Sequence, residues 1–248
     1  MTRRPSSLRT RLASWARTFG PPTVVDYVRR VVDAGDCRTV VDIGCGMSSY
    51  LTRFRPGLKT IGIDAHPEAI RESQRHDVHD EYLVADVVKM PAQTIRQLLA
   101  DKIGDQKVDL VTAFSVIEHL PKHDGWKLLE KCEELSSKYI IVETPNGFLE
   151  QGPEFGNPFQ RHLSGWFAHD FEGLGYQCFG TNGTKYLRGY MGEPRIPVPG
   201  TLVFDQVLLS RMIGARDRPH HAFELVAVKD VRGVPARHAS RDNSLFES

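Results

Sequence analysis

The chain has 248 residues, of which 40% are hydrophobic and 25% charged, as expected of a folded globular protein rather than a disordered one. That length allows one large domain or at most two small ones. The 32 Lys and Arg residues nearly balance the 31 Asp and Glu residues, and a net charge of +1 argues against a general nucleic-acid coat.

Two further absences narrow the class of protein. The four cysteines form no CxxC pair, which argues against a zinc ribbon and favours a reducing, cytoplasmic compartment. The sequence has no run of ~18 apolar residues, so we expect no membrane-spanning helix.

Residues 1–22 are predicted to hold an amphipathic helix that ends at a Gly-Pro-Pro run. Arginines occupy one face, and four apolar side chains share the other at helical spacing: Leu8, Leu12, Trp15 and Phe19. We expect this helix to pack on the main domain, and the alternative is contact with a membrane surface or RNA. No continuous apolar stretch follows the basic residues, so no secretory signal is expected.

Residues 23–231 are predicted to form the main domain. Five short apolar runs, rich in β-branched residues, predict strands at 39–43, 60–64, 82–86, 108–113 and 139–143. Helical stretches at 67–75, 93–100 and 125–135 lie between them. Strands that alternate with helices predict parallel βαβ units, and therefore a doubly wound sheet with helices on both faces.

The last third of the chain follows a different pattern. We predict a helix at 168–174, a strand at 176–179 and a last strand at 223–228. Between the two strands, a loop rich in Pro and Gly at 186–200 precedes a predicted helix at 201–213. Residues 232–248 show no apolar period, and they are predicted to be a disordered tail.

The first predicted strand ends in an acid, Asp42, and two glycines, Gly44 and Gly46, open the turn that follows. Glycine lets the backbone turn tightly and approach a ligand, and ligands of open α/β sheets bind at the carboxyl ends of the strands. A dinucleotide loop has a third glycine where this chain has Ser49, and Asp42 would repel a phosphate. The carboxylate suits a ligand with a positive charge.

This DxGxG motif resembles motif I of the class I S-adenosylmethionine-dependent methyltransferases, although many members have a third glycine where Ser48 stands. The resemblance implies a Rossmann-like, mostly parallel seven-stranded sheet with an antiparallel last strand, preceded by an insertion or lid at 186–221. It also implies an acid at the second strand end on the ribose hydroxyls and another after the third strand near the adenine. The cofactor contacts that it implies come from Asp42, Gly44, Cys45, Gly46, Asp64, Ala65, Asp86, Val87, Phe114 and Ser115. Each acid alone could instead cap the next helix, but their order and spacing favour the ligand site.

Residues 115–121 resemble a segment of ubiquinone-pathway O-methyltransferases and of small-RNA 2′-O-methyltransferases. In the RNA enzymes two glutamates and two histidines hold a divalent metal; here Glu118 and His119 match, Ser115 replaces the first glutamate, and His162 is the candidate second histidine. The resemblance therefore leaves an incomplete site for Mg²⁺ or Mn²⁺ as one alternative. Catalysis by His119 or His162 as a general base is another, and a purely structural role for His119 is a third.

Together these features predict methyl transfer from S-adenosylmethionine to an oxygen or nitrogen of a small-molecule acceptor. Three alternatives stay open: a metal-assisted RNA 2′-O-methyltransferase, a non-catalytic cofactor-binding partner of another subunit and, last, an NAD-binding reductase. The charge balance argues against a nucleic-acid partner, while the basic N-terminal residues leave one open. The acceptor and the oligomeric state do not follow from the sequence.

Overall fold

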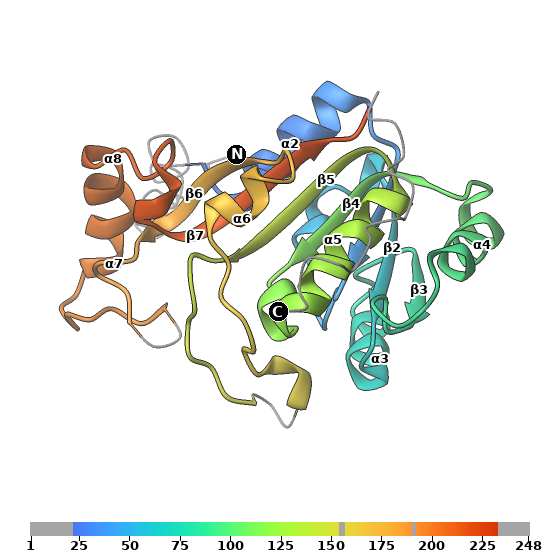
Figure 1. Ribbon diagram of the computed structural model, residues 1–248, viewed down its shortest axis with the longest axis horizontal. Helices are drawn as coiled ribbons and strands as arrows, with labels where there is room; N and C mark the ends of the chain where they lie inside the picture. The colour runs from blue at the N-terminus through green and yellow to red at the C-terminus, as the bar shows by residue number, and fades with distance from the viewer. Residues whose placement is uncertain (1–21, 154–156, 190–191, 233–248) are drawn as a thin grey trace, which may run out of the picture.

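The computed structural model describes residues 22–153, 157–189 and 192–232. Its centre is one seven-stranded sheet with the strand order β3-β2-β1-β4-β5-β7-β6 (Figure 1). β1 to β5 pair in parallel, whereas β7 runs antiparallel to both β5 and β6. The predicted fold class is therefore confirmed, including its antiparallel last strand. The strands are β1 (Thr39–Ile43), β2 (Lys59–Asp64), β3 (Glu81–Val84), β4 (Val108–Phe114), β5 (Ser136–Pro145), β6 (Gln177–Thr184) and β7 (Ala222–Asp230).

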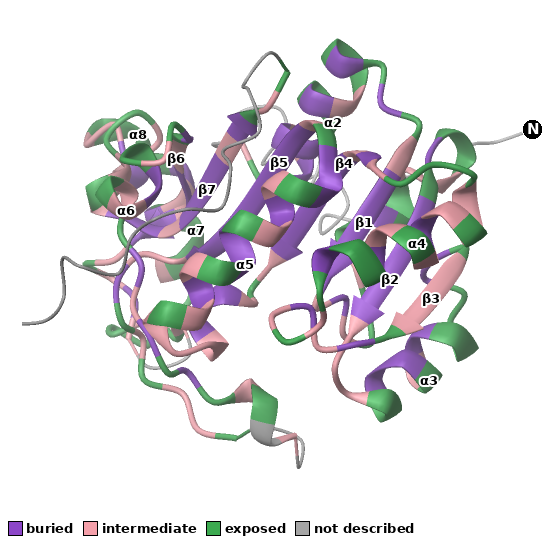
Figure 2. Cartoon of the chain, turned by 45° about the vertical axis from the view of Figure 1, so that its right-hand side comes forward, coloured by how far each residue is buried: buried purple, intermediate pink, exposed green. Residues whose placement is uncertain are grey.

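Helices cover both faces of this sheet, and the central strands between them are buried (Figure 2). On one face, α4 (Ala92–Ile103), α5 (Lys122–Leu135) and α6 (Ala168–Glu172) pack on the larger apolar core. On the other face, α2 (Val24–Gly35) packs against side chains of β1, β4 and β5. α3 (Pro67–Arg75) lies beside β2 and β3. Both faces of a parallel sheet are thus shielded from water, as its continuous apolar strands require.

The helix α2 was not among the sequence predictions, although the sequence carries a signal for it. Val24, Val28 and Val31 recur at helical spacing, and all three are buried on the sheet. Thr23 caps the helix, because both its backbone N–H and its hydroxyl donate to Asp26 Oδ2, at 2.8 Å each. The cap and the valine stripe together explain why the chain turns helical at this point.

Several element boundaries differ from the predicted ones. β3 ends at Val84, so Asp86 lies in a turn, while β6 continues to Thr184. The predicted helix at 201–213 is one continuous helical stretch of three parts: α7 (Thr201–Phe204), a π-helical turn η6 (Asp205–Leu209) and α8 (Ser210–Met212). The π turn coincides with Asp205, whose buried carboxylate bonds to β6.

Short 3₁₀ turns join the main elements: η1 (Tyr50–Arg53), η2 (Arg55–Gly57), η3 (Ile117–His119), η4 (Pro158–Gln160) and η7 (Pro219–His221). The segment between β6 and β7, which the sequence marked as an insertion, carries α7 to α8. The predicted N-terminal helix and nearly all of the predicted tail lie outside the described residues. Within those residues, no helix has the length and hydropathy needed to span a membrane.

Candidate functional site

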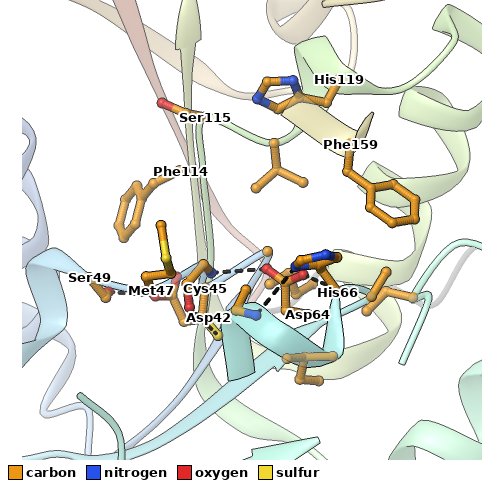
Figure 3. Close-up of a pocket in the computed structure, with 18 of the residues that line it drawn as sticks. Asp42, Cys45, Met47, Ser49, Asp64, His66, Phe114, Ser115, His119 and Phe159 are labelled. Atoms are coloured by element: carbon orange, nitrogen blue, oxygen red, sulfur yellow. Dashed lines mark hydrogen bonds between the residues drawn. The ribbon is translucent and has the colours of Figure 1, made fainter. Parts of the chain in front are cut away.

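A cavity of about 930 Å³ opens at the carboxyl ends of β1, β2 and β4 (Figure 3). Its walls are the loops after these strands, together with part of the segment between β5 and α6. All ten residues predicted to contact a cofactor line it: Asp42, Gly44, Cys45, Gly46, Asp64, Ala65, Asp86, Val87, Phe114 and Ser115. The parallel strands bring these residues together, because their carboxyl ends meet at one edge of the sheet.

The loop after β1 depends on two glycines with left-handed backbone, Gly44 (φ +66°) and Gly46 (φ +56°). A side chain on Gly44 would place its Cβ 2.3 Å from Val116 Cγ2, so the loop and the turn after β4 can approach only if this residue is glycine. The Gly44 amide donates to the Ile63 carbonyl at 2.7 Å, which ties the loop to β2. Cys45 lines the cavity between them, with its side chain largely buried.

Asp42 is buried beneath this loop, with 2% of its surface exposed. Its carboxylate accepts hydrogen bonds from Ser49 Oγ at 2.5 Å and from Thr112 Oγ1 at 2.7 Å. Burial raises the pKa of Asp42 to about 6, although both hydrogen bonds act to lower it. His79 Nε2 lies 3.5 Å from the same carboxylate. Asp42 therefore orders the loop from below, and its charge is sensitive to pH just below neutrality.

Asp64, at the end of β2, holds two backbone amides at the cavity wall. Its Oδ2 accepts from the Gly46 amide at 2.9 Å, and its Oδ1 accepts from the His66 amide at 2.8 Å. One dashed line at Asp64 in Figure 3 leads to the glycine loop. The side chain thus links the glycine loop to the turn that begins α3.

Asp86 closes the turn after β3. Its Oδ1 accepts from the amides of Val88 and Lys89, at 3.1 and 3.2 Å, and its Oδ2 pairs with Lys89 Nζ at 2.8 Å. Burial acts to raise the pKa of Asp86, but these hydrogen bonds and the lysine charge outweigh it and lower the pKa. Asp86 therefore has the contacts of a capping residue and also faces the cavity.

The charged groups that line the cavity are negative. The described residues that line it include neither lysine nor arginine, and they include five carboxylates: Asp42, Asp64, Glu68, Glu72 and Asp86. Such a wall repels a phosphate and attracts a cation.

The turn after β4 forms another wall of the cavity. Ser115 has φ +51°, a left-handed conformation that is rare for a residue with a side chain and is often found at functional sites. Its hydroxyl donates to Glu143 Oε2 at 3.1 Å. The rings of Phe114 and Tyr50 meet edge to face, with centroids 5.5 Å apart, and both line the cavity.

Behind Ser115 lies a pair of carboxyl groups, the buried Glu143 on β5 and the half-buried Glu224 on β7. Glu143 is 4% exposed, and its pKa is raised well above its usual value, first by burial and then by the charges of Glu224 and Glu118. Asn182 Nδ2 donates to Glu224 Oε1 at 2.8 Å. Neither glutamate was among the site residues predicted from the sequence, although an acid at the end of a predicted apolar strand is a signal for Glu143.

The structure also brings together the three predicted metal ligands. One ligand atom each from Glu118, His119 and His162 lies within 4.8 Å of the others. His119 lines the cavity, whereas Glu118 and His162 lie behind it. Ser115, which replaces the first glutamate of the related metal sites, directs its hydroxyl to Glu143 instead.

Both histidines are held by backbone carbonyls. His119 Nδ1 lies 3.2 Å from the Arg161 carbonyl, and His162 Nδ1 lies 2.6 Å from the Leu149 carbonyl. A carbonyl only accepts, so each Nδ1 carries the proton and each Nε2 keeps its lone pair. Burial lowers the pKa of His119 to about 4, and it raises the pKa of Glu118, whose Oε2 accepts from Thr144 Oγ1, to about 8.

Comparison with known proteins shows what the central part of this chain is similar to. Residues 41–137, which contain the glycine loop and the ends of β1 to β4, match the family described as "Methyltransferase domain". The sheet has the strand order and the antiparallel last strand of the class I members. This part of the chain is therefore similar to methyltransferase domains.

Two curated proteins that are similar to this chain are ubiquinone biosynthesis O-methyltransferases. The protein of Alkalilimnicola ehrlichii is 26% identical over 131 residues, which cover 50% of this chain and 49% of the relative. The protein of Pasteurella multocida is 23% identical over 152 residues, or 58% and 56% of the two chains. The chain spans about half the length of the curated relatives it matches.

Among solved structures, the N-terminal domain of EvdMO1 with S-adenosylhomocysteine bound is 15% identical. It superposes with a TM-score of 0.50 and covers 88% of this chain and 84% of that one. The likeness concerns the fold alone.

Proposed function

We propose that the methyltransferase domain transfers a methyl group from S-adenosylmethionine to an oxygen or nitrogen of a small-molecule acceptor. The observation that carries this proposal is the charge of the main cavity, whose lining, among the described residues, has five carboxylates and no lysine or arginine. S-adenosylmethionine carries a sulfonium and an ammonium group but no phosphate, so it fits this wall. NAD⁺ carries a pyrophosphate, which the same wall repels.

In this proposal, three parts of the cavity bind three different parts of the cofactor. Asp64 faces the ribose hydroxyls, and Asp86 with Val87 faces the adenine. Gly44 and Gly46 let the backbone approach the methionine portion closely, next to Phe114. The match to the methyltransferase family over residues 41–137 supports this placement.

The protein has two tasks in this reaction: it aligns the acceptor with the methyl group, and it removes one proton from the acceptor. The acceptor oxygen or nitrogen attacks the methyl carbon in line with the breaking C–S bond, and the electron pair of that bond stays on sulfur. His119 is the group on the cavity wall that we propose as the proton acceptor, through Nε2. Its lowered pKa keeps it neutral and able to accept at pH 7, and His162 behind it holds the ring in place, with centroids 4.8 Å apart.

Two observations support the wider assignments of compartment and acceptor. The four cysteines are free, and three of them are buried, as suits a reducing, cytoplasmic compartment. The relatives named for ubiquinone biosynthesis are O-methyltransferases, which favours a small-molecule oxygen acceptor. Within this proposal the domain spans residues 23–231, and the segment at 186–221 contributes to acceptor choice.

The test is thermal unfolding with S-adenosylhomocysteine, with NAD⁺ as the control ligand. At about 100 times its Kd a ligand adds ~2.7 kcal/mol, which is roughly 5–11 °C in Tm for a chain of this length. We expect that shift with S-adenosylhomocysteine alone, and a smaller one in Asp64→Asn. A shift with NAD⁺ but not with S-adenosylhomocysteine would overturn the assignment.

A second candidate, metal-assisted methylation of an RNA 2′-hydroxyl, rests on the cluster of Glu118, His119 and His162. The donor set fits a divalent ion, because both Nε2 atoms keep a lone pair and the carboxylate lies within 4.8 Å. A bound Mg²⁺ or Mn²⁺ would supply positive charge next to the acceptor oxygen. Since the raised pKa leaves Glu118 protonated at pH 7, we expect ion binding to release a proton and to tighten up to about pH 8.

Mn²⁺ separates the two candidates. If Mn²⁺ raises the Tm of the wild-type protein in the presence of S-adenosylhomocysteine, and not that of Glu118→Gln, the metal site moves ahead of the histidine base. RNA affinity that falls steeply with salt would then support the nucleic-acid acceptor. A non-catalytic partner subunit would show cofactor binding, no turnover and no effect of His119→Ala on function.

A further inference from the structure

A second cavity, of about 560 Å³, lies on the other side of the segment that follows β5. It shares no lining residue with the main cavity. Its walls are that segment, the loop after β6 and the start of β7, which lie side by side in Figure 1. The lining residues are Pro145, Asn146, Phe148, Leu149, Glu150, Lys185, Tyr186, Arg188, Gly189, Arg195 and Phe223.

The second cavity has two cations that no described carboxylate neutralises. Lys185 is half-buried, and its ammonium group has no ion pair with a described residue. The Nε of Arg195 donates to the Arg188 carbonyl at 2.6 Å, which fixes the guanidinium and leaves its terminal nitrogens available. Arg188 is different, because its Nε lies 3.3 Å from the buried carboxylate of Asp205. Glu150 is the single carboxylate in the lining, and it is exposed.

The remaining wall of the second cavity is aromatic. Phe148 and Tyr186 are 61% and 50% exposed, which is high for side chains of this size. Phe223 forms a buried part of the lining, and the Arg188 guanidinium lies 5.3 Å from its ring centroid. Exposed aromatic rings beside unpaired cations suit a ligand with one apolar end and one anionic end.

A chain of contacts that begins at one backbone carbonyl links the walls of the two cavities. Leu149 lines the second cavity, and its carbonyl accepts from His162 Nδ1 at 2.6 Å. The ring of His162 in turn packs on His119, which lines the main cavity. A molecule bound against Leu149 would therefore contact the residue whose carbonyl holds His162, which in turn packs on His119.

We propose that the second cavity binds the anionic end of the methyl acceptor, a carboxylate or phosphate ester that carries an aryl or other apolar group. Lys185 and Arg195 bind the anion, and Phe148 and Tyr186 cover the apolar part. The inference rests on the proposed methyl transfer, because it assigns that reaction an acidic acceptor.

A series of probes with one carbon skeleton isolates the charge. Isothermal titration at saturating S-adenosylhomocysteine would compare 3-phenylpropionate, 3-phenylpropanol and 3-phenylpropylamine, with phenyl phosphate as the second anion. We expect both anions to bind at least about tenfold more tightly than the alcohol, and the amine to bind least, because charge-assisted hydrogen bonds are about twice as strong as neutral ones. Higher salt should weaken the binding of the two anions and leave the affinity of the alcohol unchanged.

Three variants test the role of charge: two should lower the affinity for the anions and one should raise it. Lys185→Gln and Arg195→Gln should each weaken anion binding about fivefold to tenfold, whereas Glu150→Gln should tighten it. Lys131→Gln on α5 removes the same charge outside both cavities and should change nothing.

The outcomes separate the two proposals. If S-adenosylhomocysteine binds but the anions bind no better than the alcohol, or bind equally to the Lys185 and Arg195 variants, the acidic acceptor is wrong and methyl transfer stands. If S-adenosylhomocysteine itself does not bind, the proposed function fails first.

Discussion

Gly44 and Gly46 share a left-handed backbone but differ in what surrounds them. A Cβ on Gly44 would meet Val116, whereas a Cβ on Gly46 would meet nothing within 4 Å. We therefore expect Gly44→Ala to destabilise the protein by about 2–4 kcal/mol, from the backbone and the clash together, and Gly46→Ala by about 1–2 kcal/mol. Urea unfolding gives these free energies, and titration with S-adenosylhomocysteine should show the larger loss of affinity in Gly44→Ala.

Gly57 is the matched control for this series. It is exposed in η2, a Cβ there would meet nothing, and its backbone is not left-handed. Gly57→Ala should leave both quantities within about 0.5 kcal/mol of wild type. Equal losses in all three variants would show that the loop does not depend on the contact with Val116.

Glu143 predicts a pH dependence of stability whose sign follows from its raised pKa. The folded protein holds this proton more tightly than the unfolded chain, so the contribution is full below pH 4.5 and is lost as pH rises through the raised pKa. Glu143→Gln keeps the neutral form at every pH. As pH rises above 4.5, the unfolding free energy of wild type should therefore fall more than that of the variant.

The exposed Glu130 on α5 offers the control, and Glu130→Gln should reproduce the wild-type pH profile. Parallel profiles for wild type and Glu143→Gln would mean that the Glu143 carboxyl titrates as it does in the unfolded chain.

The residues of the main cavity could be predicted from the sequence for a physical reason. The carboxyl ends of parallel strands all lie at one edge of the sheet, so the sequence alone assigns Asp42, Asp64 and Phe114 to that shared edge. It does not assign Glu143 and Glu224 to each other, because their pairing depends on the register of β5 against β7. That register is set by contacts across the sheet, which no local pattern reports.

At the scale of elements, Asp205 connects the helical stretch α7 to α8 with β6. Its carboxylate, fully buried, accepts from the Thr184 amide at 3.0 Å and from the Thr184 hydroxyl at 2.7 Å, and it pairs with Arg188. Removing it leaves a buried guanidinium without a counter-charge. We expect Asp205→Ala to cost about 3–5 kcal/mol in urea unfolding.

Asp217 serves as the comparison, because its pair with Arg216 is exposed and such pairs contribute ~0–1 kcal/mol. Replacing Asp205 and Arg188 together by Leu and Met should restore part of the loss, since no unpaired charge remains. A double variant as unstable as Asp205→Ala would show that the contacts to Thr184 dominate.

The element boundaries that the sequence misplaced have the same origin. The apolar run at 82–86 reads as a strand to its end, but Asp86 folds back on the amides of its own turn and ends the pairing early. The run at 201–213 reads as a regular helix, but the side chain of Asp205 bonds to another strand at the point where the turn widens. Specific side-chain hydrogen bonds determine both the end of β3 and the position of the π-helical turn. The helical or strand period of the sequence alone does not predict such bonds.

At the scale of the molecule, the two cavities occupy different parts of one sheet. The main cavity lies at the ends of β1, β2 and β4, and the second lies at the ends of β5 and β6 and the start of β7. The segment between β5 and α6 contributes residues to both. Under the two proposals, the cofactor and the reacting atom of the acceptor meet in the main cavity, while the anionic end of the acceptor binds in the second.

The division predicts where the protein should gain protection from hydrogen exchange. S-adenosylhomocysteine should slow exchange of the amides in the loops after β1, β2 and β3, because it orders Gly46, Asp64 and their neighbours, and it should leave α7 to α8 unchanged. Adding 3-phenylpropionate should then slow exchange around Leu149 and Lys185 and give no further change at Gly46. Exchange measured by mass spectrometry on the same peptides, with and without each ligand, resolves the two steps. Protection that spread equally over both regions with S-adenosylhomocysteine alone would mean that the molecule responds as one unit, and that the second cavity is not a separate binding site.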